Sequence, residues 1–179
     1  NITSAKNVDR VRERSSASTS ITRTKVQFSK SSLDFINTQY EALKFQNANG
    51  GDLYLFPGFI VMINKMNNEF GLIDYREIKI EHHQQRFVEN EGVPSDSNIV
   101  GQTWKYVNKN GSPDKRFKDN YQMPIALYYE INIETNKGLY ESYHFSNSDQ
   151  GEAFCNSLET YIRLLSKMNW KNEEKIDSE

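Results

Sequence analysis

The sequence is poor in the residues that build disulfides, metal centres and membrane spans. It has one cysteine and three histidines among 179 residues. A single cysteine excludes an intrachain disulfide, and a reducing, cytoplasmic setting is the default expectation for such a chain. The longest apolar run, Phe56 to Ile63, is far shorter than the ~20 residues of a transmembrane helix. We therefore expect a cytoplasmic protein without a transmembrane segment, with peripheral membrane contact left open.

Motifs for catalysis and cofactor binding are also lacking. The chain has no Walker phosphate-binding loop, no G-x-G-x-x-G fingerprint and no Cys/His zinc spacing. Neighbouring residues on a strand point to opposite faces, so His82 and His83 are poorly placed to bind one metal ion together. Cys155 falls in an apolar helical stripe, where a thiol is more often a core residue than a nucleophile. We predict a non-enzymatic protein with no cofactor and no metal site.

Acidic residues are scarce at the N-terminus. Residues 1–30 contain seven Lys/Arg against two Asp/Glu, net +5, whereas the rest of the chain contains 15 against 22, net −7. The central tract RERSSASTSITRT has few large apolar side chains with which to offset its ordering entropy. We predict a flexible basic arm or linker over 1–30, a folded domain over 31–170 and a disordered tail over 171–179. Because the sequence opens at Asn1 without an initiator Met, we expect an upstream domain of the same chain.

The segment before the first clear strand allows two interpretations. The apolar residues between Leu33 and Leu43 recur at helical spacing, and Ser31 with Asp34 resembles a capping box. The stretch Tyr40 to Phe45 fits a short strand equally well. We predict a helix over 31–45.

Strand patterns fill the next part of the chain. Four short runs rich in β-branched and aromatic residues, DLYLF, FIVMIN, EFGLIDY and EIKIEH, follow one another closely. Pro57-Gly58 fits the centre of a type II turn, and Lys65 to Asn68 supplies a polar hairpin loop. Such close succession indicates an antiparallel meander. The polar segment 82–101 is predicted to be a loop.

The last part of the domain ends in a predicted helix. Strand patterns recur in TWKYV, in the long run MPIALYYEINIETN and in YESYHFS. Between Phe154 and Met168 the apolar residues then recur at i, i+4 and i+7, which predicts an amphipathic helix of about four turns. Ser148 is the predicted N-cap.

This element order resembles a pleckstrin-homology-like (PH-like) domain. The stretch GDLYLFPGFIVMI…FGLIDYREIKI is similar to the opening strands of bacterial PH and GRAM-like domains, and WKYVNKNGSPDKRF resembles a W-x-Y-V-N-K-x-G-x-P-D-x-R-F stretch of uncharacterised bacterial proteins. Together they cover Gly51 to Met168. The resemblance implies a mainly β (α+β) fold, a bent antiparallel barrel of about seven short strands capped by one C-terminal helix. It also implies binding of peptides, phosphoinositides or other domains rather than catalysis.

The candidate binding segment is Thr103 to Pro124, which carries a net charge of +3. As a binding surface, it would contact an anionic partner through Lys109, Lys115, Lys118 and Arg116, with Arg116 as the bidentate donor. Trp104, Tyr106 or Phe117 would then serve as stacking or packing surfaces. As a structural loop, it would be anchored in the core by Trp104 and Phe117, with Asp114 and Asp119 paired to neighbouring cations.

Two functional hypotheses follow. The first is a non-catalytic recruitment module of a larger bacterial protein, which binds a protein or an anionic ligand through surface loops or a sheet edge. The second is a nucleic-acid-associated accessory domain that uses the basic arm and the 103–120 loop. Phosphate binding weakens steeply with ionic strength, whereas strand addition does not, so salt dependence separates them.

Overall fold

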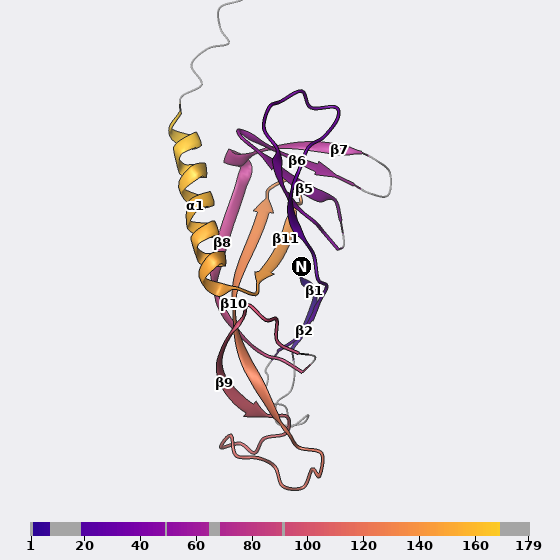
Figure 1. Cartoon of the computed structure of the whole chain (residues 1–179), viewed down its shortest axis with the longest axis vertical. Coiled ribbons are helices and arrows are strands. Elements are labelled where there is room, and N and C mark those ends of the chain that lie inside the picture. The colour runs from indigo at the N-terminus through magenta and orange to yellow at the C-terminus, as the bar shows by residue number, and fades with distance from the viewer. Residues whose placement is uncertain (1, 8–18, 49, 65–68, 91, 169–179) are drawn as a thin grey trace, which may run out of the picture.

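The computed structural model of the chain describes residues 2–7, 19–48, 50–64, 69–90 and 92–168. Within these ranges the fold is mainly β, with one long helix at the C-terminal side (Figure 1). The predicted mainly β class with a C-terminal helix is therefore confirmed. In chain order the elements are β1 (Ile2–Asn7), β2 (Thr19–Arg23), β3 (Phe28–Ser31), β4 (Ala42–Phe45), β5 (Asp52–Phe56), β6 (Phe59–Ile63), β7 (Phe70–Asp74), the 3-10 helix η1 (Tyr75–Glu77), β8 (Ile78–Val88), β9 (Asn98–Trp104), β10 (Gln122–Thr135), β11 (Tyr140–Phe145) and α1 (Ser148–Lys167).

The described strands form three antiparallel sheets. The first sheet has the order β3-β4-β5-β6-β7, which confirms the predicted meander for β5 to β7. The fourth predicted run, EIKIEH, instead belongs to β8 of the second sheet, which has the order β11-β10-β8 with β9 also paired to β10. The strands β1 and β2 form a separate two-stranded sheet. No pairing between described strands closes either larger sheet into a barrel.

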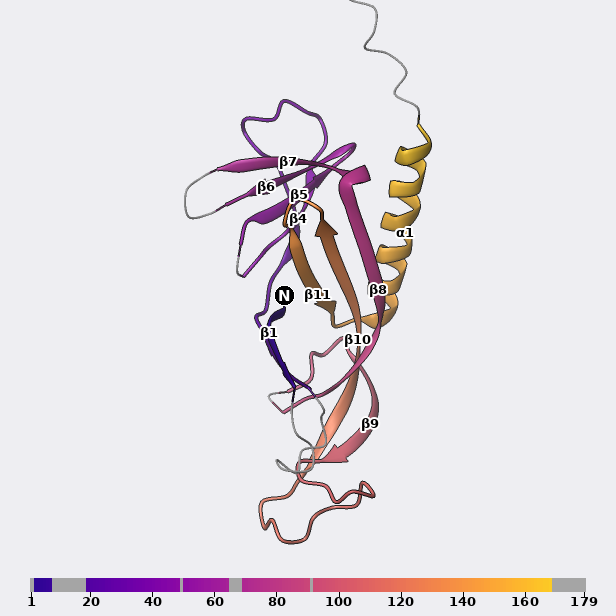
Figure 2. The same cartoon turned by 180° about the vertical axis from the view of Figure 1, so that it is seen from behind.

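Strand β10 is the longest strand and has partners along both edges. One edge pairs with β8 from Ile125 to Thr135, and the other pairs first with β9 and then with β11. Ser97 Oγ donates to the carbonyl of Ser146 at 2.9 Å, which ties the start of β9 to the end of β11. The β9–β10 hairpin therefore extends the second sheet away from the first sheet, as the view from behind shows (Figure 2).

The predicted helix over 31–45 is wrong. Residues 42–45 form β4, which pairs with β3 and β5, and residues 32–41 are a loop between strands. Long-range contacts account for this outcome: Phe28 and Phe45 pack against each other with ring centroids 4.4 Å apart, and Ala42 is fully buried. Sheet pairing and aromatic burial thus override a local helical spacing.

Two other local predictions need correction. Residues 82–88 belong to β8 and residues 98–104 to β9, so the segment 82–101 is not one loop. Its polar residues lie on strands with one solvent-facing side, where alternation rather than apolar content marks the strand. The N-cap of α1 is Asn147 rather than Ser148, since the Asn147 carboxamide accepts a hydrogen bond from Gln150 N at 3.0 Å.

The two predicted turns have different outcomes. Gly58 has a φ of 92°, the positive value that the Pro57-Gly58 turn requires. The predicted hairpin loop Lys65 to Asn68 lies outside the described residues.

The described part of the N-terminal segment contributes strands to the fold. β2 and β3 lie within the range that we assigned to the basic arm, and Phe28 of β3 packs against Phe45 and Phe145. The folded unit therefore includes residues before Ser31. Residues 8–18 of the predicted arm and all of the predicted tail lie outside the described residues.

The main core lies between the two larger sheets and α1. It joins Phe45 and Leu53 of the first sheet to Ile131 and Tyr143 of the second, with Leu158 from the helix. The apolar stripe of α1 therefore packs on the sheets, as its spacing predicts.

Close approach and a hydrogen bond fix the position of α1. A Cβ atom at Gly151 would lie 2.7 Å from Tyr129 Cβ and 2.8 Å from Phe145 Cβ, so only glycine allows this contact between helix and sheet. Further along the helix, the Tyr161 hydroxyl accepts a hydrogen bond from Gly58 N at 2.8 Å. Helix α1 is thus tied to both sheets.

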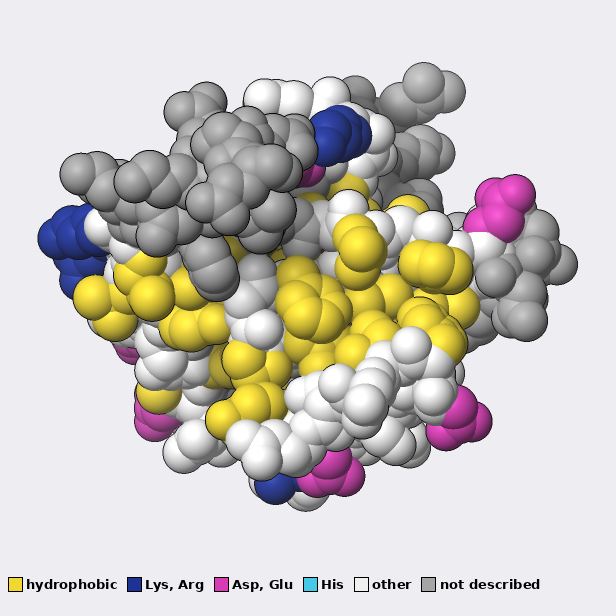
Figure 3. All heavy atoms as spheres, turned by 90° about the horizontal axis from the view of Figure 1, so that it is seen from above, with side chains coloured by type: hydrophobic (Ala, Val, Ile, Leu, Met, Phe, Trp, Pro, Cys, Tyr) yellow, Lys and Arg dark blue, Asp and Glu magenta, His cyan; other side chains and the backbone are white. Residues whose placement is uncertain are grey.

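A second, smaller apolar cluster lies on the other face of the first sheet. Tyr54, Phe56 and Val61 are buried there beneath Leu33 and Ile36 of the 32–41 loop. Beside this cluster, Figure 3 shows apolar side chains gathered on the face seen from above. The exposed apolar side chains of β7 and the 32–41 loop are Phe35, Tyr40, Phe70 and Leu72. Strand β7 is also an edge of the first sheet, so its backbone is open to strand addition.

We predict that the packing of α1 carries much of the stability. Leu158 is 8% exposed and lies in the core, whereas Leu164 on the same helix is 55% exposed. Leu158→Ala should lower the free energy of unfolding by ~2–5 kcal/mol through lost burial and a residual cavity. Leu164→Ala removes the same atoms from a solvent-facing position and should change it by less than ~0.5 kcal/mol. Urea titration of both variants measures the difference, and equal losses would contradict the assigned helix face.

Candidate functional site

The predicted binding segment forms the loop between β9 and β10. Residues 105–121, here called the basic loop, lie at the end of the molecule opposite the first sheet (Figures 1 and 2). The hairpin pairing brings its two ends together: Trp104 pairs with Gln122, and Lys105 N donates to Tyr121 O at 3.0 Å. The loop is therefore a compact projection of the second sheet.

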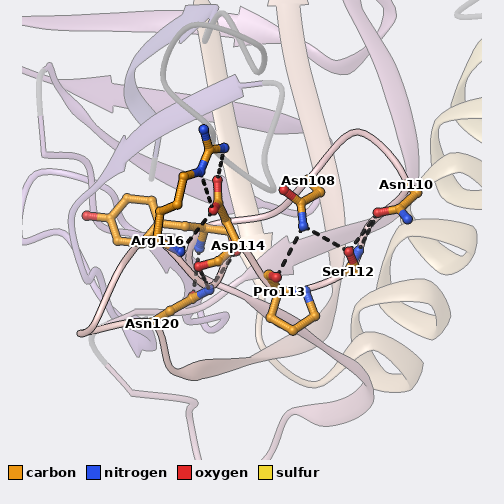
Figure 4. Close-up of polar contacts among 8 residues, drawn as sticks. Asn108, Asn110, Ser112, Pro113, Asp114, Arg116 and Asn120 are labelled. Carbon is orange, nitrogen blue, oxygen red and sulfur yellow. Dashed lines mark hydrogen bonds and ion pairs between the residues drawn. The ribbon is translucent and has the colours of Figure 1, made fainter.

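The Asn120 side chain links distant parts of the basic loop. Its Oδ1 atom accepts a hydrogen bond from Tyr106 N at 2.9 Å, and its Nδ2 atom donates to Tyr106 O at 2.8 Å and to Asp114 O at 3.3 Å. Figure 4 shows these contacts converging on one amide. One side chain thus supplies hydrogen-bond partners to the backbone of both Tyr106 and Asp114.

A small turn, residues 108–113, forms the second part of the loop. The Asn108 amide donates to Ser112 Oγ at 3.0 Å and to Pro113 O at 3.2 Å (Figure 4). Gly111 has a φ of 82°, and its N–H donates to Asn108 O at 2.9 Å. The turn therefore depends on the Asn-Gly dipeptide that marks it in the sequence.

Asp114 and Arg116 form the central ion pair of the loop. Asp114 is 2% exposed, and its carboxylate accepts hydrogen bonds from Arg116 Nε at 2.8 Å and Nη2 at 2.6 Å. The hydrogen bonds from Arg116 to Asp114 raise the pKa of the guanidinium above its ordinary value. The Arg116 guanidinium, which we expected to bind a partner, is thus hydrogen-bonded to Asp114 within the loop (Figure 4).

The aromatic residues of the segment also contact one another. The rings of Tyr106 and Phe117 stack with centroids 4.0 Å apart, and Lys105 Nζ lies 5.1 Å from the Tyr106 ring centroid. Lys105 Nζ is also 3.4 Å from Asp119 Oδ2. Trp104, at the end of β9, is half-buried, and so is Phe117. Neither residue belongs to a described core cluster. The loop is held by its own contacts rather than by aromatic anchors in the core.

Three cations of the basic loop face solvent. The two acidic residues each pair with one cation, Asp114 with Arg116 and Asp119 with Lys105. Lys109, Lys115 and Lys118 are exposed and form no ion pair with any described residue. The loop therefore presents three ammonium groups on a hydrogen-bonded frame, which can attract carboxylates or phosphates.

The histidines take separate structural roles. His82 lies half-buried with Nδ1 2.9 Å from the Tyr129 hydroxyl, while His83 is exposed on the opposite side of β8. His144 Nε2 lies 2.7 Å from Glu130 Oε2, a pairing that follows from the β10–β11 register. The sequence offers no local signal for this pair, because the two residues meet only across strands. Among the described residues no group of three His, Cys, Asp or Glu is placed to hold a metal ion.

The His144–Glu130 pair makes stability depend on pH. Hydrogen bonds from His144 and from Asn132 hold the pKa of Glu130 below its ordinary value of 4.5, although partial burial opposes this shift. A lowered folded-state pKa contributes stability above the unfolded value, and that stability is lost as the pH falls through the folded-state pKa.

We predict that Glu130→Gln flattens the acid limb of the stability curve. The variant should lose less free energy of unfolding than the wild type as the pH falls below 4.5, because the wild-type carboxylate is the group that becomes protonated. Glu41→Gln, at an exposed carboxylate of the 32–41 loop, serves as the control. Urea titrations across this pH range measure the slopes. Identical slopes for the wild type and Glu130→Gln would contradict the coupling.

Cys155 is a core residue. It is 0% exposed, and burial raises the pKa of its thiol to about 12. We predict that a thiol reagent at about pH 8 labels the native protein much more slowly than the urea-unfolded protein, because thiolate and access are both lacking. Since Cys155 is the sole cysteine, Cys155→Ser gives the blank for this assay. Rapid native labelling would restore the nucleophile hypothesis.

Comparisons with known proteins give no assignment for this site. No protein-family model matches the chain, and no curated protein or solved structure is significantly similar to it. Among the described residues no helix has the length and apolar character needed to cross a membrane. The basic loop therefore has to be interpreted from its own geometry.

Proposed function

We propose that the chain is a non-catalytic interaction module that binds an acidic segment of a protein partner through Lys109, Lys115 and Lys118. The observation that carries this proposal is the division of charge in the basic loop: each carboxylate neutralises one cation, and three lysines remain exposed. They project from a domain whose residues 31–179 are net acidic. A local basic surface on an acidic body directs an anionic partner to one place.

The internal contacts of the loop support this role. A flexible loop that must be ordered on binding spends interaction energy on that ordering. Here Asn120, the Asp114–Arg116 pair and the Tyr106–Phe117 stack fix the backbone before any partner arrives. The lysines then lose only side-chain freedom when they meet carboxylates.

The same contacts favour a protein over a nucleic acid. Arg116 is the group best suited to bidentate phosphate binding, but Asp114 occupies its fork. Tyr106, which we predicted as a stacking surface, is already stacked on Phe117. The remaining lysines are point charges that suit carboxylates, and a strand of nucleotides would find few free aromatic faces.

A PH-like architecture belongs to this proposal as well. The seven strand patterns found in the sequence correspond to β5 to β11, and α1 follows them, which is the element order that the resemblance implies. The packing of α1 on β8 and β10, with Leu158 in the core shared by the two larger sheets, supports the same relation. In this interpretation the chain serves as the recruitment module of a larger bacterial protein.

We predict that changing Lys109, Lys115 and Lys118 to Ser weakens binding of a fluorescein-labelled Glu-rich peptide at least about tenfold. The fold should be unaffected, because exposed charges contribute little to stability. The matched control changes Lys25, Lys30 and Lys167 to Ser, which removes the same net charge from exposed positions outside the loop. Fluorescence anisotropy at low and high salt measures both affinities.

Each result of this titration has a defined meaning. Equal losses in both triple variants would show that only net charge matters and would contradict a built site. An oligothymidylate that binds more tightly than the peptide, and loses binding in the loop variant, would favour the nucleic-acid hypothesis. Partner binding that resists salt and survives the loop changes would point to the β7 edge.

A further inference from the structure

A second charged site joins the N-terminal strands to the second sheet. Arg23, the last residue of β2, places Nη2 2.6 Å from Oε1 and 2.8 Å from Oε2 of Glu89, just after β8. Glu89 is 5% exposed, whereas the Arg23 side chain is 28% exposed. The Glu89 carboxylate is thus buried next to β8, whereas the cation that pairs with it is carried by β2.

Two aromatic rings complete the surroundings of the guanidinium. Arg23 Cζ lies 4.9 Å from the ring centroid of Phe87 and 5.0 Å from that of Tyr128. The two rings meet edge to face, with centroids 5.7 Å apart. A planar, weakly hydrated guanidinium is the cation best suited to aromatic faces combined with a carboxylate.

The parts of this site differ in how firmly they are held. Phe87 and Tyr128 lie on the paired strands β8 and β10, and Glu89 N donates to Pro124 O at 2.9 Å. Arg23 lies on the β1–β2 sheet, which pairs with no described strand of the two larger sheets. The acceptor half of the site is therefore part of the rigid sheet, and the donor half is carried on a separate hairpin.

We propose that Glu89, Phe87 and Tyr128 form a binding site for a guanidinium group, which Arg23 fills within the chain and an arginine side chain of a partner fills by displacing it. Leaving a buried carboxylate without its cation is strongly destabilising, so displacement that exchanges one arginine for another is favoured over simple separation of the pair. Arg23 is the tethered competitor and has the advantage of a high effective concentration. The β1–β2 hairpin then acts as an autoinhibitory strap over the site.

The test uses the full 179-residue chain with Arg23→Gln and two small probes. One probe is Nα-acetyl-arginine methylamide, and the other is its citrulline analogue, which has nearly the same shape without the charge. NMR titration of the variant should show the arginine probe binding about tenfold more tightly than the citrulline probe, because hydrogen bonds to the Glu89 carboxylate are charge-assisted only with the guanidinium. Adding Glu89→Gln to the variant should remove this preference.

The wild-type protein supplies an independent measurement if Arg23→Gln fails to fold. The arginine probe should accelerate hydrogen exchange of the backbone amides of β2 as it displaces Arg23, and the citrulline probe should not. Equal binding of both probes to a folded Arg23→Gln variant would overturn the proposal. Unchanged β2 exchange in the wild type at saturating arginine probe would also overturn it and leave Arg23 as a permanent structural contact.

Discussion

The pairing of β10 with strands on both of its edges positions every site described above. Because side chains alternate across a strand, Ile131 and Ile133 face the core on one side, while Tyr128 and Glu130 face Arg23 and His144 on the other. A slip of one residue in this register would exchange the two sets. The first residues of the same strand, paired with β9, also close the basic loop. One long strand therefore fixes the core, the guanidinium site and the lysine surface together.

The sequence predicts the parts of this fold whose contacts are local or strictly periodic. The strands β5 to β7 and the apolar stripe of α1 can be predicted from the sequence. Alternation in a strand, or a 3.6-residue repeat in a helix, points the apolar residues of the element to one face. Residues 31–45 and 82–88 were misassigned for the opposite reason. Their conformation is decided by partners far along the chain, as the contact between Phe28 and Phe45 illustrates. No window of sequence contains that information.

The basic loop shows how much of a site can be foreseen from composition. Its turn dipeptides and its net charge of +3 were visible, and so was the possibility that Asp114 and Asp119 pair with nearby cations. Which cations pair could not be predicted, because Lys115 and Lys118 are each adjacent to a carboxylate in the sequence, whereas Arg116 is two residues from Asp114. Geometry decides which cation pairs with Asp114. The planar guanidinium of Arg116, two residues beyond Asp114, can make two parallel hydrogen bonds to the carboxylate, whereas a lysine ammonium group cannot.

Two arginine–carboxylate pairs of the described residues, Asp114–Arg116 and Arg23–Glu89, have similar short contacts and opposite consequences. In Asp114–Arg116 both partners lie two residues apart on one loop, so separating them would require the loop itself to unfold. In Arg23–Glu89 the partners are 66 residues apart, and Arg23 lies on the separate β1–β2 sheet, so the pair can separate while the two larger sheets keep their own hydrogen bonds. Hydrogen-bond length therefore does not distinguish a structural clasp from an exchangeable contact. The connectivity of the elements that carry the partners does, and on that criterion Arg23 is the arginine that another chain can replace.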